Sequence, residues 1–194
     1  MPPDHSQHDY LKRLPASYYR GAAWVHWTMT IQDRSRGWLD EAMHAAVREA
    51  LLHTLVRYKL VCPAYTLMPD HAHFLWCGCS VESDQLKASS FFRRMWNEHL
   101  KSVDVALQKQ GYDHVLLEKE RNPEAFEDTC VYIMRNPEDA GFIDGWRDWK
   151  FSGSIVQGYP WLDLQKDDYW ERFWEAYNSM REPEPVSYTH LTLP

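Results

Sequence analysis

Apolar residues recur along the chain in two spacings, one typical of strands and one of helices. Residues 22–31 are rich in aromatic and β-branched side chains, which predicts a first strand. From Leu39 to about Lys59, apolar residues return every three or four positions, as in an amphipathic helix. Residues 61–76 form an apolar run that contains Pro69, which predicts one or two strands with a turn or bulge at the proline.

The same alternation continues further along the chain. Residues 83–101 predict a second helix, and residues 111–118 predict a strand that opens with a turn. A third helix is expected to begin at Asn122-Pro123, with the asparagine as its cap, and to stop at Asn136-Pro137. An acidic helix is expected near residues 167–180.

This order of elements predicts an α+β fold. Strands that alternate with helices in so short a chain favour an antiparallel sheet with helices on one face, the ferredoxin-like split βαβ arrangement. The expected divisions are a flexible arm over residues 1–21, a catalytic domain over 22–160 and an acidic C-terminal appendage over 161–185. Residues 186–194 change abruptly to an uncharged, β-like composition and are interpreted as a non-native or disordered tail.

The composition narrows the possible settings of the protein. The chain has 194 residues, which suit one well-buried domain. No apolar run approaches the roughly 18 residues that a membrane span needs, so no membrane partner is expected. The four cysteines form no Cys-x-x-Cys pair. They are predicted to be reduced thiols of a cytoplasmic protein.

Charge is unevenly distributed. Residues 1–112 carry 13 Lys and Arg against 11 Asp and Glu, whereas residues 113–194 carry 8 against 17, and the net charge is −7. Nucleic-acid-binding domains are usually basic, so this balance counts against one, although local basic patches remain compatible with an acidic total.

His71 and His73 are the first candidate functional residues. Side chains two apart on a strand point to the same side of a sheet, so these two would project together, with Ala72 and Phe74 on the opposite face. Two neutral imidazoles side by side are a ready pair of metal ligands. The alternative is one structural and one exposed histidine.

Tyr132 and Asn136 lie one turn apart on the third predicted helix and hence on one face. A tyrosine can act as a covalent nucleophile, and an asparagine oxygen suits a hard divalent ion. Together with the histidines they would make a cation site for phosphodiester chemistry, in which Tyr132 attacks phosphorus. The alternative is a half-buried helix tyrosine and a C-terminal cap before Pro137.

Two segments resemble a known family. The segment Leu67-Met-Pro-Asp-His71-Ala-His73-Phe-Leu is similar to the paired-histidine (HUH) motif of single-tyrosine transposases. The segment Tyr132-Ile-Met-Arg-Asn136-Pro-Glu-Asp-Ala-Gly-Phe resembles the nucleophile helix of their REP-associated tyrosine transposase subgroup. The likeness spans roughly residues 22–154 and includes a Trp149-x-x-Ser152 element, in which Gly153 replaces a second serine.

The resemblance implies a function as well as a fold. It implies Mg²⁺ or Mn²⁺ as cofactor and cleavage and rejoining of single-stranded DNA at hairpin-forming repeats. His71, His73 and Asn136 would be the metal ligands and Tyr132 the nucleophile, which makes the chain a transposase and endonuclease of DNA transposition and recombination. DNA contacts are expected on the second helix, at Lys87, Arg93, Arg94 and Lys101. Whether the protein is a monomer or a homodimer stays open.

Two other functions fit the same residues. One is a DNA-binding module that kept the fold and lost robust catalysis, which the acidic balance favours. The other is an unrelated metallohydrolase built on His71, His73 and His114.

Overall fold

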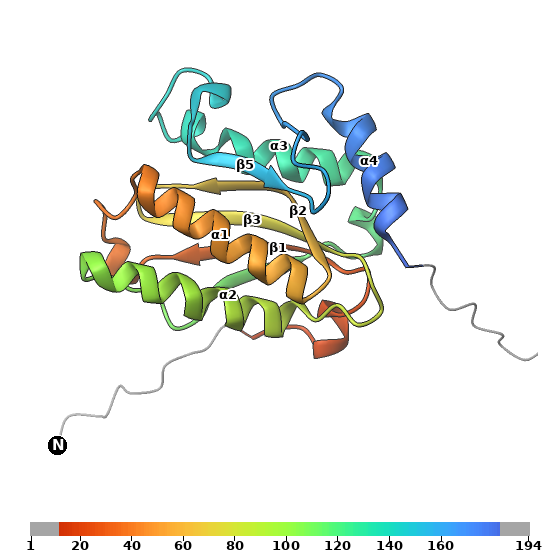
Figure 1. Ribbon diagram of the computed structural model, residues 1–194, viewed down its shortest axis with the longest axis horizontal. Coiled ribbons are helices and arrows are strands. Elements are labelled where there is room, and N and C mark those ends of the chain that lie inside the picture. The colour runs from red at the N-terminus through yellow and green to blue at the C-terminus, as the bar shows by residue number, and fades with distance from the viewer. Residues whose placement is uncertain (1–11, 183–194) are drawn as a thin grey trace, which may run out of the picture.

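The fold is built on one antiparallel sheet. A computed structural model describes residues 12–182, and the tail at 186–194 lies outside them. The sheet has five strands in the order β4-β1-β3-β2-β5 (Figure 1). Their bounds are β1 Trp24–Thr30, β2 Leu60–Leu67, β3 His71–Gly78, β4 Tyr112–Val115 and β5 Ser152–Ile155. The first four strands have the ferredoxin-like order, which confirms the predicted fold class, and β5 extends the sheet beside β2.

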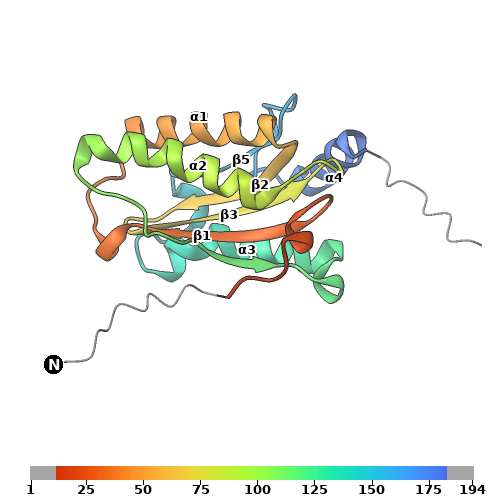
Figure 2. The ribbon, with the colours of Figure 1, turned by 90° about the horizontal axis from the view of Figure 1, so that it is seen from below.

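Helices cover both faces of this sheet. Helices α1 (Glu41–Arg57) and α2 (Gln85–Leu100) lie together on one face, as expected. Helix α3 (Pro123–Asp139) is the third predicted helix, but it lies on the opposite face of the sheet (Figure 2). The expectation that all helices share one face is therefore wrong. Helix α4 (Tyr169–Met180) packs at the end of the molecule next to α3. Within residues 12–182, no helix combines the length and apolar character needed to cross a membrane.

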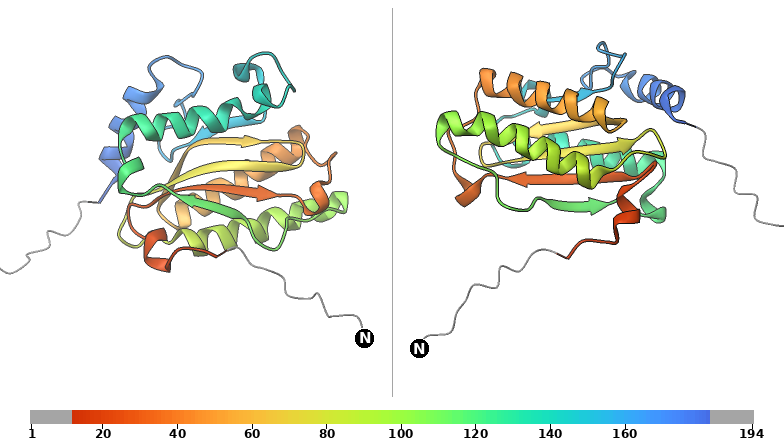
Figure 3. Two further views of the ribbon diagram at one scale, coloured as in Figure 1. Left: turned by 180° about the vertical axis from the view of Figure 1, so that it is seen from behind. Right: turned by 60° about the horizontal axis from the view of Figure 1, so that its bottom comes forward.

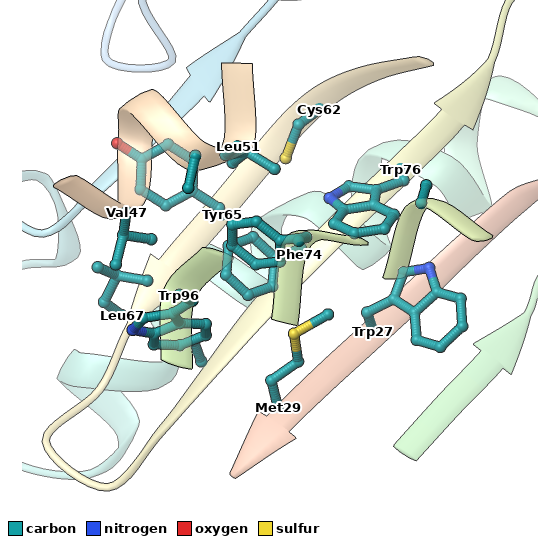
Figure 4. Close-up of a cluster of buried hydrophobic side chains, with 14 of the residues drawn as sticks. Trp27, Met29, Val47, Leu51, Cys62, Tyr65, Leu67, Phe74, Trp76 and Trp96 are labelled. Carbon is teal, nitrogen blue, oxygen red and sulfur yellow. The ribbon is translucent and has the colours of Figure 1, made fainter. Parts of the chain in front are cut away.

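Strand β3 separates two cores. Its residues Ala72, Phe74 and Trp76 belong to the core beneath α1 and α2, while Leu75 and Cys77 belong to the core beneath α3. Figure 4 shows the first core, where Phe74 packs edge-on against Trp96 of α2, with ring centroids 6.1 Å apart. Because side chains alternate along a strand, the histidines of β3 share the α3 side with Leu75.

The predicted turn at Pro69 joins β2 to β3. All eight residues of β2 are buried, as expected of a strand covered on both faces. The backbone N–H of Met68 donates to the carbonyl of His71 at 2.8 Å, so the hairpin closes tightly and β3 begins at the first histidine.

The segment after residue 160 is part of the domain and not an appendage. Phe173 of α4 is fully buried and stacks on Phe126 of α3, with ring centroids 5.6 Å apart. The hydroxyl of Tyr177 accepts from Trp24 Nε1 and donates to the carbonyl of Gly78, both at 3.0 Å. The predicted boundary at residue 161 is therefore wrong, because the acidic helix carries a buried aromatic face that completes the second core.

The end of the predicted N-terminal arm is also packed. Tyr19 is completely buried, and its hydroxyl donates to the carboxylate of Asp113. Arg13 Nε lies 2.8 Å from the same carboxylate. Burial and, second, the bond to Asp113 raise the pKa of Tyr19 to about 12, so the phenol keeps its proton. Residues 13–19 are thus tied to β4 and do not form a flexible arm.

Candidate functional site

The two histidines face one another at the start of β3. Their Nε2 atoms lie 3.1 Å apart. On the outer side of the pair, His71 Nδ1 lies 2.7 Å from Asp70 Oδ1. On the inner side, His73 Nδ1 lies 3.1 Å from both Thr28 Oγ1 and His26 Nε2. With both Nδ1 atoms occupied by these partners, the two Nε2 atoms are left facing one another.

Strand β1 supplies the inner partners through its register with β3. Thr28 pairs with His73, and Thr30 pairs with His71. Residues paired across an antiparallel ladder place their side chains on the same face, so His26, Thr28 and Thr30 lie on the α3 side. Sequence reasoning missed His26. Its signal is the alternation of these three polar residues with the buried Trp27, Met29 and Ile31.

Burial keeps the inner histidines neutral. It is the main cause that lowers the pKa of His73 to about 3, followed by the neighbouring His26 and His71. Burial also lowers the pKa of His26 to about 4, with a further contribution from His114. Both imidazoles are therefore uncharged near neutral pH, which is the form that binds metal ions.

Asp70 anchors the outer side of the pair. One oxygen bonds to His71, and Oδ2 lies 3.2 Å from Arg34 NH1. Partial burial opposes ionisation of this carboxyl, but the hydrogen bonds from His71 and Arg34 outweigh it and lower the pKa of Asp70. The carboxylate thus fixes the ring orientation of His71, the arrangement that metal-binding histidines usually have.

Helix α3 carries Tyr132 and Asn136 and lies over the face of the sheet to which the histidines belong; the left-hand view of Figure 3 shows this helix in front of the sheet. The helix begins at the predicted cap, where the Asn122 side chain accepts from the backbone N–H of Ala125 at 2.9 Å. The ring of Tyr132 lies 6.0 Å from that of His26 and 6.1 Å from that of His73, and the residue is 54% exposed. Residues of β1, β3 and α3, which are far apart in the sequence, are thereby brought together.

The sequence predicted that this helix stops at Asn136-Pro137. In the structure it continues to Asp139. A proline inside a helix leaves the carbonyl four residues earlier without its N–H partner, here that of Ile133. The Asn136 side chain compensates: its Nδ2 lies 3.4 Å from the Ile133 carbonyl and donates to the Tyr132 carbonyl at 2.7 Å. Asn136 is also close enough to His73 for its side chain to oppose the lowering of the His73 pKa.

The residues present fit a divalent ion. Two ligand atoms about 2.1 Å from one ion are about 3 Å apart when they meet it at right angles. The separation of the two Nε2 atoms, 3.1 Å, agrees with this spacing. With its Nδ2 donating to the backbone, the amide oxygen of Asn136 is the atom that could act as a third ligand.

Within residues 12–182, no site is built only from ionisable ligands. In the described part of the chain, no group of three or more His, Cys, Asp and Glu residues could hold a metal ion. His114, the third ligand of the metallohydrolase alternative, is exposed, and its Nε2 lies 2.8 Å from Glu120 Oε1. The structure therefore disfavours that alternative.

The expected DNA-binding cations are not brought to this site. They lie on or next to α2, on the opposite face of the sheet. Arg93 donates to the carbonyls of Gln108 and Lys109. The others also have partners within α2 or at its ends: Lys87 lies 3.5 Å from Asp84, Arg94 lies over the ring of Phe91, and Lys101 lies 2.6 Å from Glu98.

The Trp149 element secures β5 at the sheet edge. Trp149 Nε1 donates to the carbonyl of Leu67 at 2.9 Å, and Ser152 Oγ lies 2.7 Å from Thr66 Oγ1. At Gly153, an added Cβ would lie 2.9 Å from the hydroxyl of Tyr65. Gly153 therefore stands where Tyr65 leaves no room for a side chain.

Comparison with solved structures identifies a protein of the same fold. No protein-family model and no curated protein matches the sequence. A solved structure described as the REP-associated tyrosine transposase bound to a REP hairpin superimposes with a TM-score of 0.61. The alignment covers 73% of this chain and 82% of that chain at 20% sequence identity. At this identity, the likeness establishes a shared fold.

Proposed function

We propose that the protein is a metal-dependent single-stranded DNA endonuclease and strand transferase that uses Tyr132 as its nucleophile. The observation that carries this proposal is the position of the Tyr132 ring, 6.1 Å from that of His73 and exposed beside two converging imidazoles. An exposed phenol next to a cation site is the arrangement that attack on a phosphodiester requires.

The reaction divides into two transesterifications. In the first, the phenol loses its proton, a bond forms between Tyr132 Oη and phosphorus, and the bond from phosphorus to one sugar oxygen breaks. That oxygen takes up a proton and leaves as a free hydroxyl. In the second, the hydroxyl of another DNA end attacks the phosphotyrosine and restores the phenol. Since the ester is conserved, strands are joined without another energy source.

His71, His73 and Asn136 would hold Mg²⁺ or Mn²⁺, since both imidazoles present Nε2 and the amide presents oxygen. When bound, the ion supplies Lewis-acid polarisation of the phosphate and neutralises developing charge. Asp70 and Thr28 hold the two rings from behind, so that the ligand atoms need little reorganisation. Helix α3 holds Asn136 one turn from the nucleophile.

The fold neighbour supports a DNA partner. Its description names a bound REP hairpin, and this chain shares the fold over most of its length. We therefore propose hairpin-bearing single-stranded DNA as the substrate. The four cysteines are free and buried, which supports the prediction of a cytoplasmic protein.

A DNA-binding module without robust catalysis is the second candidate. The net charge of −7 counts against tight DNA binding in both candidates, because low positive charge weakens the electrostatic attraction that holds DNA.

Cleavage of hairpin oligonucleotides in Mn²⁺ separates the two candidates. Wild type is expected to give a shortened strand on a denaturing gel, and Tyr132→Phe is expected to give none while still binding the DNA. Binding without cleavage by the wild type, across a broad pool of hairpins, would favour the binding module. Equal cleavage by both proteins would remove Tyr132 as the nucleophile.

A further inference from the structure

The turn after β1 contains two successive residues in left-handed backbone conformation, Asp33 with φ 56° and Arg34 with φ 53°. Such conformations are unfavourable for residues other than glycine and persist where the surroundings enforce them. Here the N–H of Gln32 donates to the carbonyl of Ala106 at 2.7 Å, and that of Ile31 donates to the carbonyl of Asp70 at 3.0 Å. The turn is thus fixed beside the histidine hairpin.

This turn presents Arg34 next to the candidate metal ligands. Its NH1 lies 3.2 Å from Asp70, the residue that also anchors His71, and its side chain is 63% exposed. A guanidinium has five N–H donors, and the contact with Asp70 uses one nitrogen. Arg34 can therefore bind an anion at the histidine pair while it keeps its contact with Asp70.

A second arginine follows two residues further along the chain, and it lies beside an aromatic ring. The guanidinium of the exposed Arg36 lies 6.0 Å from the ring centroid of Phe142, which is 43% exposed. Phe142 follows α3 and is held by its own N–H, which donates to the Pro137 carbonyl at 2.9 Å. The ring of Phe142 also lies beside that of Trp149, with ring centroids 6.0 Å apart. Trp149 in turn donates a hydrogen bond to the carbonyl of Leu67, at the end of β2 where the β2–β3 hairpin turns.

We propose that Arg34, Arg36 and Phe142 form the surface that holds single-stranded DNA at the histidine pair, with the arginines on phosphates and a base stacked on Phe142. Cations that follow the backbone and an exposed ring for an unpaired base are what single strands require. This inference rests on the proposed function and assigns DNA contacts to the site face in place of the predicted ones on α2.

Binding measurements test the surface without any chemistry. Fluorescence anisotropy would follow a labelled hairpin with single-stranded flanks, in EDTA and at several salt concentrations, with Tyr132→Phe as the parent protein. The variants Arg34→Gln, Arg34→Lys, Arg36→Gln and Phe142→Ala would be compared with Lys87→Gln, which removes the same charge on the opposite face. Thermal unfolding would verify that each variant is folded.

We expect Arg34→Gln and Arg36→Gln each to weaken binding several-fold and to reduce the slope of log K against log salt by about 0.7. Arg34→Lys should keep the slope, because it keeps the charge. Phe142→Ala should weaken binding about tenfold with little change in slope. Lys87→Gln should change neither quantity.

Two results would overturn the inference. One is a loss at Lys87→Gln as large as that at Arg34→Gln, and the other is parent-like binding by all site-face variants. Neither bears on Tyr132, whose reaction is followed separately by cleavage in Mn²⁺. Cleavage by wild type together with unaltered binding by these variants would remove the surface and leave the proposed function standing.

Discussion

His26 Nε2 lies 3.1 Å from His73 Nδ1, on the opposite side of the His73 ring from the nitrogen that faces His71. His26 therefore supports a candidate metal ligand from behind. Its ring also lies 6.0 Å from that of Tyr132. One side chain thus contacts both halves of the candidate site.

Replacing His26 should weaken metal binding. Loss of a side chain that orients a metal-binding histidine typically lowers metal affinity 10- to 100-fold. We expect a loss of about tenfold in Mn²⁺ affinity for His26→Ala, measured by titration of free Mn²⁺ with electron paramagnetic resonance. His26→Gln, which keeps a hydrogen-bonding group, should recover part of it.

His53→Ala is the matched control, because it removes an exposed histidine of α1, on the opposite face of the sheet, whose partner is Glu49. Its Mn²⁺ affinity should equal that of the wild type. A similar loss in His53→Ala and His26→Ala, or none in either, would contradict the positioning role of His26.

Gly153→Ala should destabilise the protein by about 1–3 kcal/mol, the usual cost of overpacking. The new Cβ would lie 2.9 Å from the Tyr65 hydroxyl and 3.1 Å from Arg48 NH1. Urea unfolding would measure the free energy of unfolding. In a Tyr65→Phe background the cost should shrink, because the nearest atom is gone.

Gly145→Ala controls for the loss of a glycine as such. Its φ is −139°, and the nearest atom to an added Cβ is 3.8 Å away, so no clash is expected. A Gly153→Ala protein as stable as Gly145→Ala would show that the contact with Tyr65 does not exclude a side chain.

Stability should fall as the pH is lowered below about 6.5, in part through His44. Burial and, second, the charge of Arg48 lower the pKa of His44 from 6.5 to about 4. Between these values the unfolded chain binds a proton at His44 that the folded protein does not. The contribution of neutral His44 to the free energy of unfolding is therefore fully present above pH 6.5 and is lost as the pH falls toward 4. His44 Nε2 lies 2.9 Å from the Tyr65 hydroxyl, away from the histidine pair.

Urea unfolding at pH 7.5 and at pH 5 would measure this loss. His44→Gln should lose less stability between the two pH values than the wild type, since the other buried histidines are common to both proteins. An equal or larger loss in the variant would show that His44 is not the source.

Much of the site could be predicted because its geometry is local in sequence. The period of two on a strand places His71 and His73 on one side, and the spacing of four on a helix places Tyr132 above Asn136. The register of β1 against β3 is not local, so Thr28 and His26 were not predicted as partners of His73.

The errors have physical causes. The proline rule predicted a stop at Pro137, but the rule does not account for the Asn136 side chain, which bonds to the carbonyl left by the proline. Acidity suggested an appendage after residue 160, whereas the spacing of Tyr169, Phe173 and Tyr177 gives α4 a buried face. The burial of Tyr19 depends on Asp113, some ninety residues away.

The most direct test of Tyr132 as nucleophile is the identity of the residue that carries DNA. Wild-type protein would be incubated with hairpin DNA and Mn²⁺, the covalent adduct isolated under denaturing conditions, and its tryptic peptides analysed by mass spectrometry. The peptide spanning residues 122–135 contains Tyr132 as its single tyrosine. We predict nucleotide mass on this peptide and no adduct in Tyr132→Phe. Nucleotide mass on another peptide, or strand cleavage without any adduct, would contradict the account.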